Sequence, residues 1–304
     1  MKIIFSEECL KYGTPWHPES ADRVRLAADY LKDLKSLASE SGKRPKDAGG
    51  ADGPNAQVKF EFLEPSPATD EDILKVHSRE HVRRLKNLEF YDGDSPAYPD
   101  IYTYAALSAG GAVAAAQQGG FSLMRPPGHH AASSRAAGFC YLNNIAIAVR
   151  KVGKKTLIID IDGHHGDGTQ AIFLGDPNVT YVSLHRSPLY PGSGLESVDN
   201  CHNYPLPALC GDSVYLETLD RAFNSIDTRG IEQVAISAGF DAYESDPLAS
   251  LGLTSEAYRK IGQRIARLKR PVFAVLEGGY DAANVGRNIE QLVLGLSGDR
   301  VGAG

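Results

Sequence analysis

Six short apolar segments recur along the chain, and helix-like segments separate them. Most of the six are continuously apolar and do not alternate with polar residues, as expected for strands buried on both faces of a sheet. They are KIIF (2–5), FSLM (121–124), TLIIDID (156–162), VTYVSLH (179–185), VAISAGF (234–240) and PVFAVLE (271–277). Strands that alternate with helices predict an α/β fold, with an open parallel sheet flanked by helices on both faces.

The segments between the apolar runs have helical periodicity. In residues 20–38, Val24, Ala27, Leu31 and Leu34 fall on one helical face. The other expected helices cover residues 101–118, 143–152, 213–226, 254–268 and 283–296. No internal repeat is visible, so we expect residues 1–304 to form a single domain.

One segment, residues 39–57, has neither pattern. It is polar, rich in Gly, Pro and Ala, and lacks periodicity. The sheet pattern resumes after it, so we predict a mobile insertion loop here and no domain boundary.

Charge and composition exclude several classes of protein. The net charge is −6 and the pI about 5.9, which argues against a nucleic-acid-binding surface. The four cysteines form no CxxC pair, so neither a cysteine metal site nor a disulfide framework is expected. No apolar run approaches the length of a membrane span, and the first ten residues are too acidic for a signal peptide. We therefore expect a cytoplasmic protein.

Polar side chains follow five of the apolar segments at their carboxyl ends. In chain order they are His129 and His130, the segment GHHGDG (163–168), His185, Asp241 and Asp246, and Tyr280. Ligands of open parallel sheets bind beyond the carboxyl ends of the strands. The pattern therefore predicts one polar site that five distant segments build together.

The segment DIDGHHGDG (160–168) suggests a metal site. Strand geometry would place Asp160, Asp162 and His164 on one face. A carboxylate and an imidazole suit Zn²⁺ or Fe²⁺, and a catalytic zinc usually has three protein ligands. The third ligand must come from another strand end, with Asp246 the first candidate and Asp241 the second.

The remaining polar residues suit proton transfer. A histidine that acts as a general base needs a partner on its other ring nitrogen. Asp160 and Asp167 are left to serve His129 and His130. Tyr280 follows two glycines, on a turn where its hydroxyl could donate to a developing oxyanion.

Together these segments resemble the histone deacetylase and acetylpolyamine amidohydrolase family over nearly the full chain. The resemblance rests on seven ordered motifs and on the N-terminal segment WHPESADRVRL (16–26). The motifs are RPPGHHA (125–131), GFCYLNNIAIA (138–148), DIDGHHGDGTQAIF (160–173), YVSLHR (181–186), LYPGSG (189–194), SAGFDAYESDPLASLGLT (237–254) and LEGGYD (276–281).

The resemblance implies specific catalytic roles. Zn²⁺ would be held by Asp162, His164 and Asp246. His130 would be the general base, paired with Asp167, and His129 its electrostatic partner, paired with Asp160. Tyr280 would polarise the amide carbonyl.

It also implies how the substrate would be bound. Phe139, preceded by Gly138, and Tyr190 would form the walls of an acyl-lysine tunnel, with Asp94 at its rim. Many members have Phe where this chain has Tyr190. Leu248 occupies a position where a polyamine-selective branch carries a glutamate. A structural K⁺ site would use Asp160, Asp162, His164, Ser183 and Leu184.

These implications predict a zinc-dependent amidohydrolase. Its substrate would be acyl-lysine in proteins or a small acylated amine, the second being the acetylpolyamine amidohydrolase alternative. A two-manganese ureohydrolase would need further Asp-x-Asp ligands. An acyl-lysine binding protein without activity would lack a ligand, the base or the tyrosine, and none of these is missing from the sequence.

Overall fold

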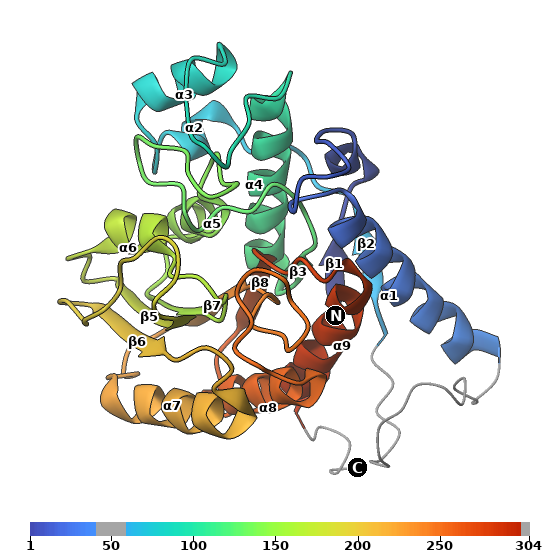
Figure 1. Ribbon diagram of the computed structural model, residues 1–304, viewed down its shortest axis with the longest axis vertical. Coiled ribbons are helices and arrows are strands. Elements are labelled where there is room, and N and C mark those ends of the chain that lie inside the picture. The colour runs from blue at the N-terminus through green and yellow to red at the C-terminus, as the bar shows by residue number, and fades with distance from the viewer. Residues whose placement is uncertain (41–58, 299–304) are drawn as a thin grey trace.

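An eight-stranded parallel sheet runs through the described part of the chain (Figure 1). The computed structural model describes residues 1–40 and 59–298. The strand order is β2-β1-β3-β8-β7-β4-β5-β6, and every neighbouring pair is parallel. The strands are β1 (Lys2–Ile4), β2 (Glu61–Leu63), β3 (Phe121–Ser122), β4 (Thr156–Asp160), β5 (Val179–Arg186), β6 (Cys201–Leu206), β7 (Gln233–Ala238) and β8 (Val272–Leu276). The predicted fold class is confirmed.

Helices cover both faces of the sheet (Figure 1). One face packs mainly against α1 (Asp22–Glu40), α7 (Gly211–Ser225), α8 (Ser255–Ala266) and α9 (Ala282–Ser297). The other packs against α2 (Asp70–Ile73), α3 (Arg79–Lys86), α4 (Ile101–Gln118), α5 (Asn144–Val152) and α6 (Asp167–Phe173). A short 3₁₀ helix, η1 (Glu7–Leu10), follows β1.

The central strand β4 shows why continuous apolar runs predict such a sheet. All five of its residues are buried. Leu157 and Ile159 pack in the core beside α7, α8 and α9, whereas Ile158 packs in the core on the opposite face. Successive side chains of a strand point to opposite faces, so a strand covered on both sides must be apolar throughout.

Two edge strands were not predicted from the sequence. β2 has only three residues, and β6 (CHNYPL) contains polar residues and Pro205. Edge strands tolerate proline because the backbone groups on their outer side form no hydrogen bonds with a neighbouring strand. Polar side chains are tolerated there because the edge is nearer to solvent. Neither segment therefore carries the apolar signal that revealed the inner strands.

The predicted strand 156–162 is shorter in the structure and ends at Asp160. Beyond it, the backbone N–H of Asp162 donates to the Asp160 carboxylate at 3.2 Å, and that of His164 donates to the Asp162 carboxylate at 2.8 Å. Aspartate side chains that accept from the backbone two residues on favour turns. Asp162 and His164 thus lie together on a turn and not on one face of a strand.

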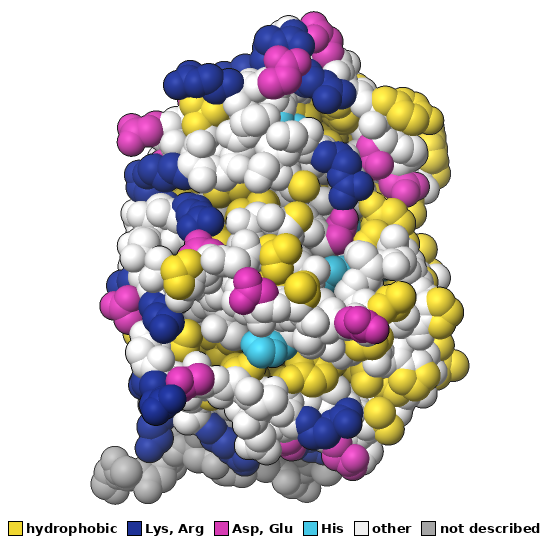
Figure 2. Space-filling view, turned by 90° about the vertical axis from the view of Figure 1, so that its left-hand side faces the viewer, with side chains coloured by type: hydrophobic (Ala, Val, Ile, Leu, Met, Phe, Trp, Pro, Cys, Tyr) yellow, Lys and Arg dark blue, Asp and Glu magenta, His cyan; other side chains and the backbone are white. Residues whose placement is uncertain are grey.

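The predicted insertion 39–57 lies outside the described residues, except that positions 39 and 40 are the last two of α1. The strands of the sheet come from residues between 2 and 276 of the chain. The assignment of all 304 residues to a single domain stays a prediction. Among the described helices, none is long and apolar enough to span a membrane. On the face shown in Figure 2, Lys and Arg side chains are interspersed with Asp and Glu side chains.

Candidate active site

Five neighbouring strands carry the candidate site. β3, β8, β7, β4 and β5 are consecutive in the sheet, and they are the five strands whose carboxyl ends lead into the polar segments of the sequence. Because parallel strands end at one edge, their following loops converge there. The site is therefore assembled from loops that are up to about 150 residues apart, as in the 149 residues that separate Gly128 from Glu277.

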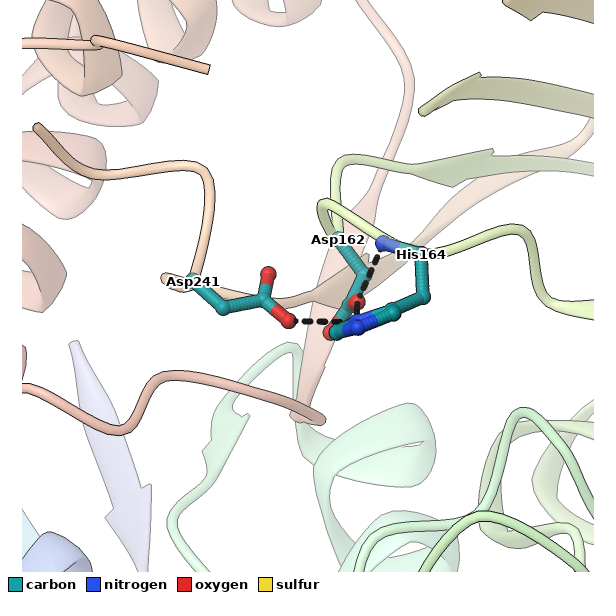
Figure 3. Close-up of side chains that lie close together, drawn as sticks. All are labelled: Asp162, His164 and Asp241. Atoms are coloured by element: carbon teal, nitrogen blue, oxygen red, sulfur yellow. Dashed lines mark hydrogen bonds and ion pairs between the residues drawn. The ribbon is translucent and has the colours of Figure 1, made fainter. Parts of the chain in front are cut away.

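Three of these residues form a candidate metal site (Figure 3). The potential ligand atoms of Asp162, His164 and Asp241 all lie within 4.8 Å of one another, and all three side chains are buried. His164 Nδ1 is 3.2 Å from Asp162 Oδ1 and 2.8 Å from Asp241 Oδ2. One nitrogen thus faces a carboxylate oxygen from each of the two loops that follow the neighbouring strands β4 and β7.

Asp246, the first candidate for the third ligand, is not in this cluster. Its carboxylate accepts four backbone N–H groups at 2.7 to 3.3 Å, two on each oxygen. The donors are Leu248, Ala249, Tyr280 and Asp281. The structure places Asp241, the second candidate, beside Asp162 and His164. Asp246 instead fixes the turn that carries Tyr280.

The charges of the cluster fit a bound cation. Burial and the negative charge of Asp162 raise the pKa of Asp241 to about 7. Burial lowers the pKa of His164, but Asp241 and Asp162 outweigh it and raise that pKa to about 10. Two buried carboxylates are therefore crowded around one imidazole, an arrangement that a divalent cation would relieve. Oxygen and nitrogen donors of this kind suit a first-row metal such as Zn²⁺.

Two buried histidines lie next to the cluster, each with its own aspartate. His129 Nδ1 is 3.1 Å from Asp160 Oδ2, and His130 Nδ1 is 2.8 Å from Asp167 Oδ1. The two rings lie 4.1 Å apart. His129 Nε2 is 3.8 Å from Asp162 Oδ1, so this histidine borders the metal cluster. The structure thus brings together both pairs that the sequence suggested.

The two histidines differ in their protonation. Burial lowers the pKa of His129, but the charges of Asp162 and Asp160 outweigh burial and raise it well above its usual value. Burial and the nearby charge of His129 lower the pKa of His130 to about 3. His130 is therefore neutral near pH 7, whereas His129 is cationic.

Aromatic side chains lie beside His130 and beside Tyr280. Tyr190, which is 41% exposed, has its ring 5.1 Å from that of His130. Phe139 has its ring 5.7 Å from that of Tyr280. Gly138 has a φ of +53°, and a Cβ there would lie 2.6 Å from the His130 ring. Glycine is thus required where the chain passes His130.

Asp94 and Leu248 lie farther out. Asp94 is exposed, and its carbonyl lies 3.3 Å from His17 Nε2. Because His17 Nδ1 accepts from the backbone N–H of Glu19, Nε2 carries the proton and donates. The His17 ring packs edge-on against Phe139 at 4.9 Å. Leu248 is half-buried.

The residues suggested for potassium lie on two paired strands and the turn that follows. Asp160 of β4 is in register with Ser183 of β5, and Leu184 follows Ser183. Ser183 Oγ is 2.9 Å from His185 Nδ1. Nearby, His165 Nδ1 lies 2.8 Å from Ser193 Oγ, and its Nε2 lies 2.9 Å from Gln170 Oε1.

A buried ionic network was missed from the sequence. The Glu19 carboxylate accepts from Arg23 Nη1 at 3.1 Å and from Arg125 Nη2 at 2.6 Å. Arg23 also donates to the carbonyls of Glu277 and Gly279, in the Glu-Gly-Gly segment directly before Tyr280. Glu19 and Arg23 lie in the N-terminal motif (16–26). Arg125, the other partner of Glu19, is 106 residues away, so no local sequence pattern reveals this contact.

The family model for the histone deacetylase domain matches residues 17–296. The chain belongs to the histone deacetylase family. A relative from Archaeoglobus fulgidus, named as a probable deacetylase, is 37% identical over 309 residues, which cover 91% of this chain and 80% of that protein. An acetylpolyamine amidohydrolase from Mycoplana ramosa is 35% identical over 176 residues, about half of each chain.

Two solved structures share the fold of this chain. The HD domain of HDA15 superposes with a TM-score of 0.82 and 29% identity, over 96% of this chain and 87% of that one. The acetylpolyamine aminohydrolase of Burkholderia pseudomallei gives a TM-score of 0.84 over 98% of each chain. Its sequence is 23% identical to this chain, so this comparison supports a shared fold and no more.

Proposed function

We propose that this member of the histone deacetylase family is a zinc-dependent deacetylase. It hydrolyses the amide bond of an acyl-lysine in a protein or of a small acylated amine. One observation carries the proposal: a buried cluster of Asp162, His164 and Asp241 lies beside a neutral histidine, His130, that an aspartate orients. Membership of the deacetylase family supports the reaction class.

In this proposal Asp162, His164 and Asp241 hold Zn²⁺, with Fe²⁺ as the other metal that these ligands suit. The cluster favours Asp241 as the third ligand. Asp246, the first candidate from the sequence, stays the alternative, because a carboxylate that binds a metal is ordinarily hydrogen-bonded as well. A bound zinc ion supplies Lewis acidity toward water and toward an amide carbonyl oxygen.

The two histidines divide the proton chemistry. Asp167 accepts the Nδ1 proton of His130, which leaves Nε2 free to take a proton. His130 removes the proton from the attacking water and delivers it to the amine nitrogen when the carbon–nitrogen bond breaks. His129, cationic and held by Asp160, stabilises the negative charge that develops nearby.

Tyr280 stabilises the carbonyl oxygen as it becomes negative. Its backbone N–H is bonded to Asp246 at 2.7 Å, and the Arg23 guanidinium lies 4.7 Å from the centre of its ring. The turn is thereby fixed on both sides, as a preorganised oxyanion donor must be.

The substrate chain passes between Phe139 and Tyr190, where Gly138 leaves room, and Asp94 contacts the substrate at the rim. Leu248 replaces the glutamate of the polyamine-selective branch, which favours acyl-lysine over acetylpolyamine. A structural K⁺ would use Asp160, Asp162, His164, Ser183 and Leu184. The cytoplasmic location stays a prediction.

Relatives named acetylpolyamine amidohydrolase make acetylated polyamines the second candidate substrate. A panel of acetyl-lysine peptides, longer acyl-lysines and acetylated polyamines, compared by kcat/KM on zinc-loaded protein, tests the proposal. We expect turnover that a chelator abolishes. Binding of these amides with no turnover by the zinc-loaded protein would instead establish an acyl-lysine binding protein.

A further inference from the structure

One fully buried carboxylate lies outside the metal cluster and the histidine pairs. Glu277, directly after β8, is 0% exposed. Its Oε2 accepts the backbone N–H groups of Gly128 at 2.7 Å and His129 at 3.0 Å. Its Oε1 accepts from Ser237 Oγ at 3.3 Å. Burial of a carboxylate costs free energy unless hydrogen-bond donors compensate it. The three donors to Glu277 supply that compensation, and two of them belong to the loop that carries His129 and His130.

The backbone of Glu277 leads into the turn that carries Tyr280. Its carbonyl accepts from Arg23 Nη2. The next residue, Gly278, donates its N–H to Asp162 Oδ2 at 2.7 Å, and Tyr280 donates its N–H to Asp246. The main chain of Glu277 is therefore anchored to the oxyanion side of the site, while its side chain holds the loop of the two histidines.

The histidine loop cannot easily adjust to a lost contact. A Cβ on Gly128 would lie 2.5 Å from the backbone nitrogen of Asn144, so the loop is already packed against α5. The N–H groups of Gly128 and His129 have no place to turn toward water, because both histidines beside them are buried. Misplacement of a reacting group by about 1 Å can cost about 10²-fold in rate.

We propose that Glu277 is a positioning residue, whose carboxylate sets the place of the His129–His130 loop relative to Tyr280. This inference rests on the proposed function, because it concerns the same site. The role requires an acceptor at Oε2 and not a negative charge. Burial raises the pKa of Glu277 to about 7, and the neutral acid would still offer a carbonyl oxygen to both N–H groups.

Three substitutions separate the acceptor from the charge. Glu277→Gln keeps a carbonyl oxygen for Gly128 and His129 and turns its amide toward Ser237 Oγ, which can accept. Glu277→Met keeps the length and removes both acceptors. Glu277→Asp keeps the charge but is one methylene too short. Ser237→Ala serves as the control, because it removes only the contact at Oε1.

The measurements are kcat and KM on the best substrate of the panel, zinc content, and amide hydrogen exchange of residues 125–131. We expect Glu277→Gln and Ser237→Ala to stay within about threefold of the wild-type kcat, and Glu277→Met and Glu277→Asp to lose about 10²-fold in kcat with little change in KM or zinc. Exchange of the Gly128 and His129 amides should rise in Glu277→Met and Glu277→Asp alone.

Equal losses in Glu277→Gln and Glu277→Met would show that the charge matters, and would overturn the inference. So would wild-type turnover and exchange in Glu277→Asp, which keeps the inference testable if Glu277→Met fails to fold. A wild-type protein that turns over no amide would refute the proposed function, whereas the exchange data would still report on Glu277.

Discussion

Adjacent residues of the same type acquire different chemistry from their neighbours. His129 lies between two carboxylates, Asp160 and Asp162, and is held cationic. His130 lies beside that cation and is held neutral, with one aspartate on Nδ1. The roles of acid–base group and electrostatic partner thus follow from their surroundings and not from their identity.

The two aspartates after β7 differ in the same way, which gives a prediction for metal binding. Asp241→Asn should lower the zinc content well below one ion per chain, because it removes a carboxylate of the cluster. Asp246→Asn should keep most of the zinc, because Asp246 lies outside the cluster of potential ligand atoms. Elemental analysis of both purified variants checks this. Full zinc in Asp241→Asn together with zinc loss in Asp246→Asn would restore Asp246 as the ligand.

Tyr280→Phe tests the oxyanion donor. Removal of one such hydroxyl should lower kcat by about 10²–10³-fold. The ring packing on Phe139 and under Arg23 would remain, so thermal stability and zinc content should match the wild type. Steady-state kinetics on the best substrate gives the answer, and a near-normal kcat would remove Tyr280 from the mechanism.

At the scale of elements, the start of α1 is tied to the end of β8. Arg23 lies in the first turn of α1 and is 1% exposed, and its guanidinium joins Glu19 to the carbonyls of Glu277 and Gly279. Arg23 and Gly279 are 256 residues apart in the chain, so these contacts join distant segments and hold the Tyr280 turn.

Arg23→Met should therefore destabilise the protein by about 1–3 kcal/mol, because the buried carbonyls of Glu277 and Gly279 lose their donor while Glu19 keeps Arg125. Arg25→Met in the same helix provides the control. Arg25 is 48% exposed and pairs with Asp22 at 2.9 Å, and its loss should cost about 0–1 kcal/mol. Urea unfolding measures both changes. Equal small losses would mean that the buried network contributes little to stability.

At the scale of the whole molecule, the sequence predicted the inner sheet because apolar runs mark strands covered on both faces. It could not reveal β2 or β6, whose residues are few or polar. Convergence of His129, His130, Asp162 and His164 followed from the rule for strand ends. The sequence ranked Asp246 before Asp241 as the third ligand, whereas the fold places Asp241 in the cluster. Both aspartates follow the same strand, so the local pattern does not show which carboxylate turns inward.

Contacts between residues far apart in the chain could not be predicted from the sequence either. Glu277 and Gly128 are 149 residues apart, and Glu19 and Arg125 are 106 apart. Nothing in the local pattern around either residue specifies such a contact, since buried ion pairs depend on how whole elements pack. Residues 39–57 are not described beyond the end of α1, so the predicted loop stays a prediction.

Zinc titration of metal-free protein tests the central claim most directly. Acetate release from an acetyl-lysine peptide is followed while Zn²⁺ is added in fractions of an equivalent. We predict no release without metal, a linear rise, and a plateau at about one Zn²⁺ per chain, as expected for one three-ligand catalytic site. Full activity in metal-free protein, or a rise that never saturates near one equivalent, would contradict the assignment of Asp162, His164 and Asp241 as the catalytic metal site.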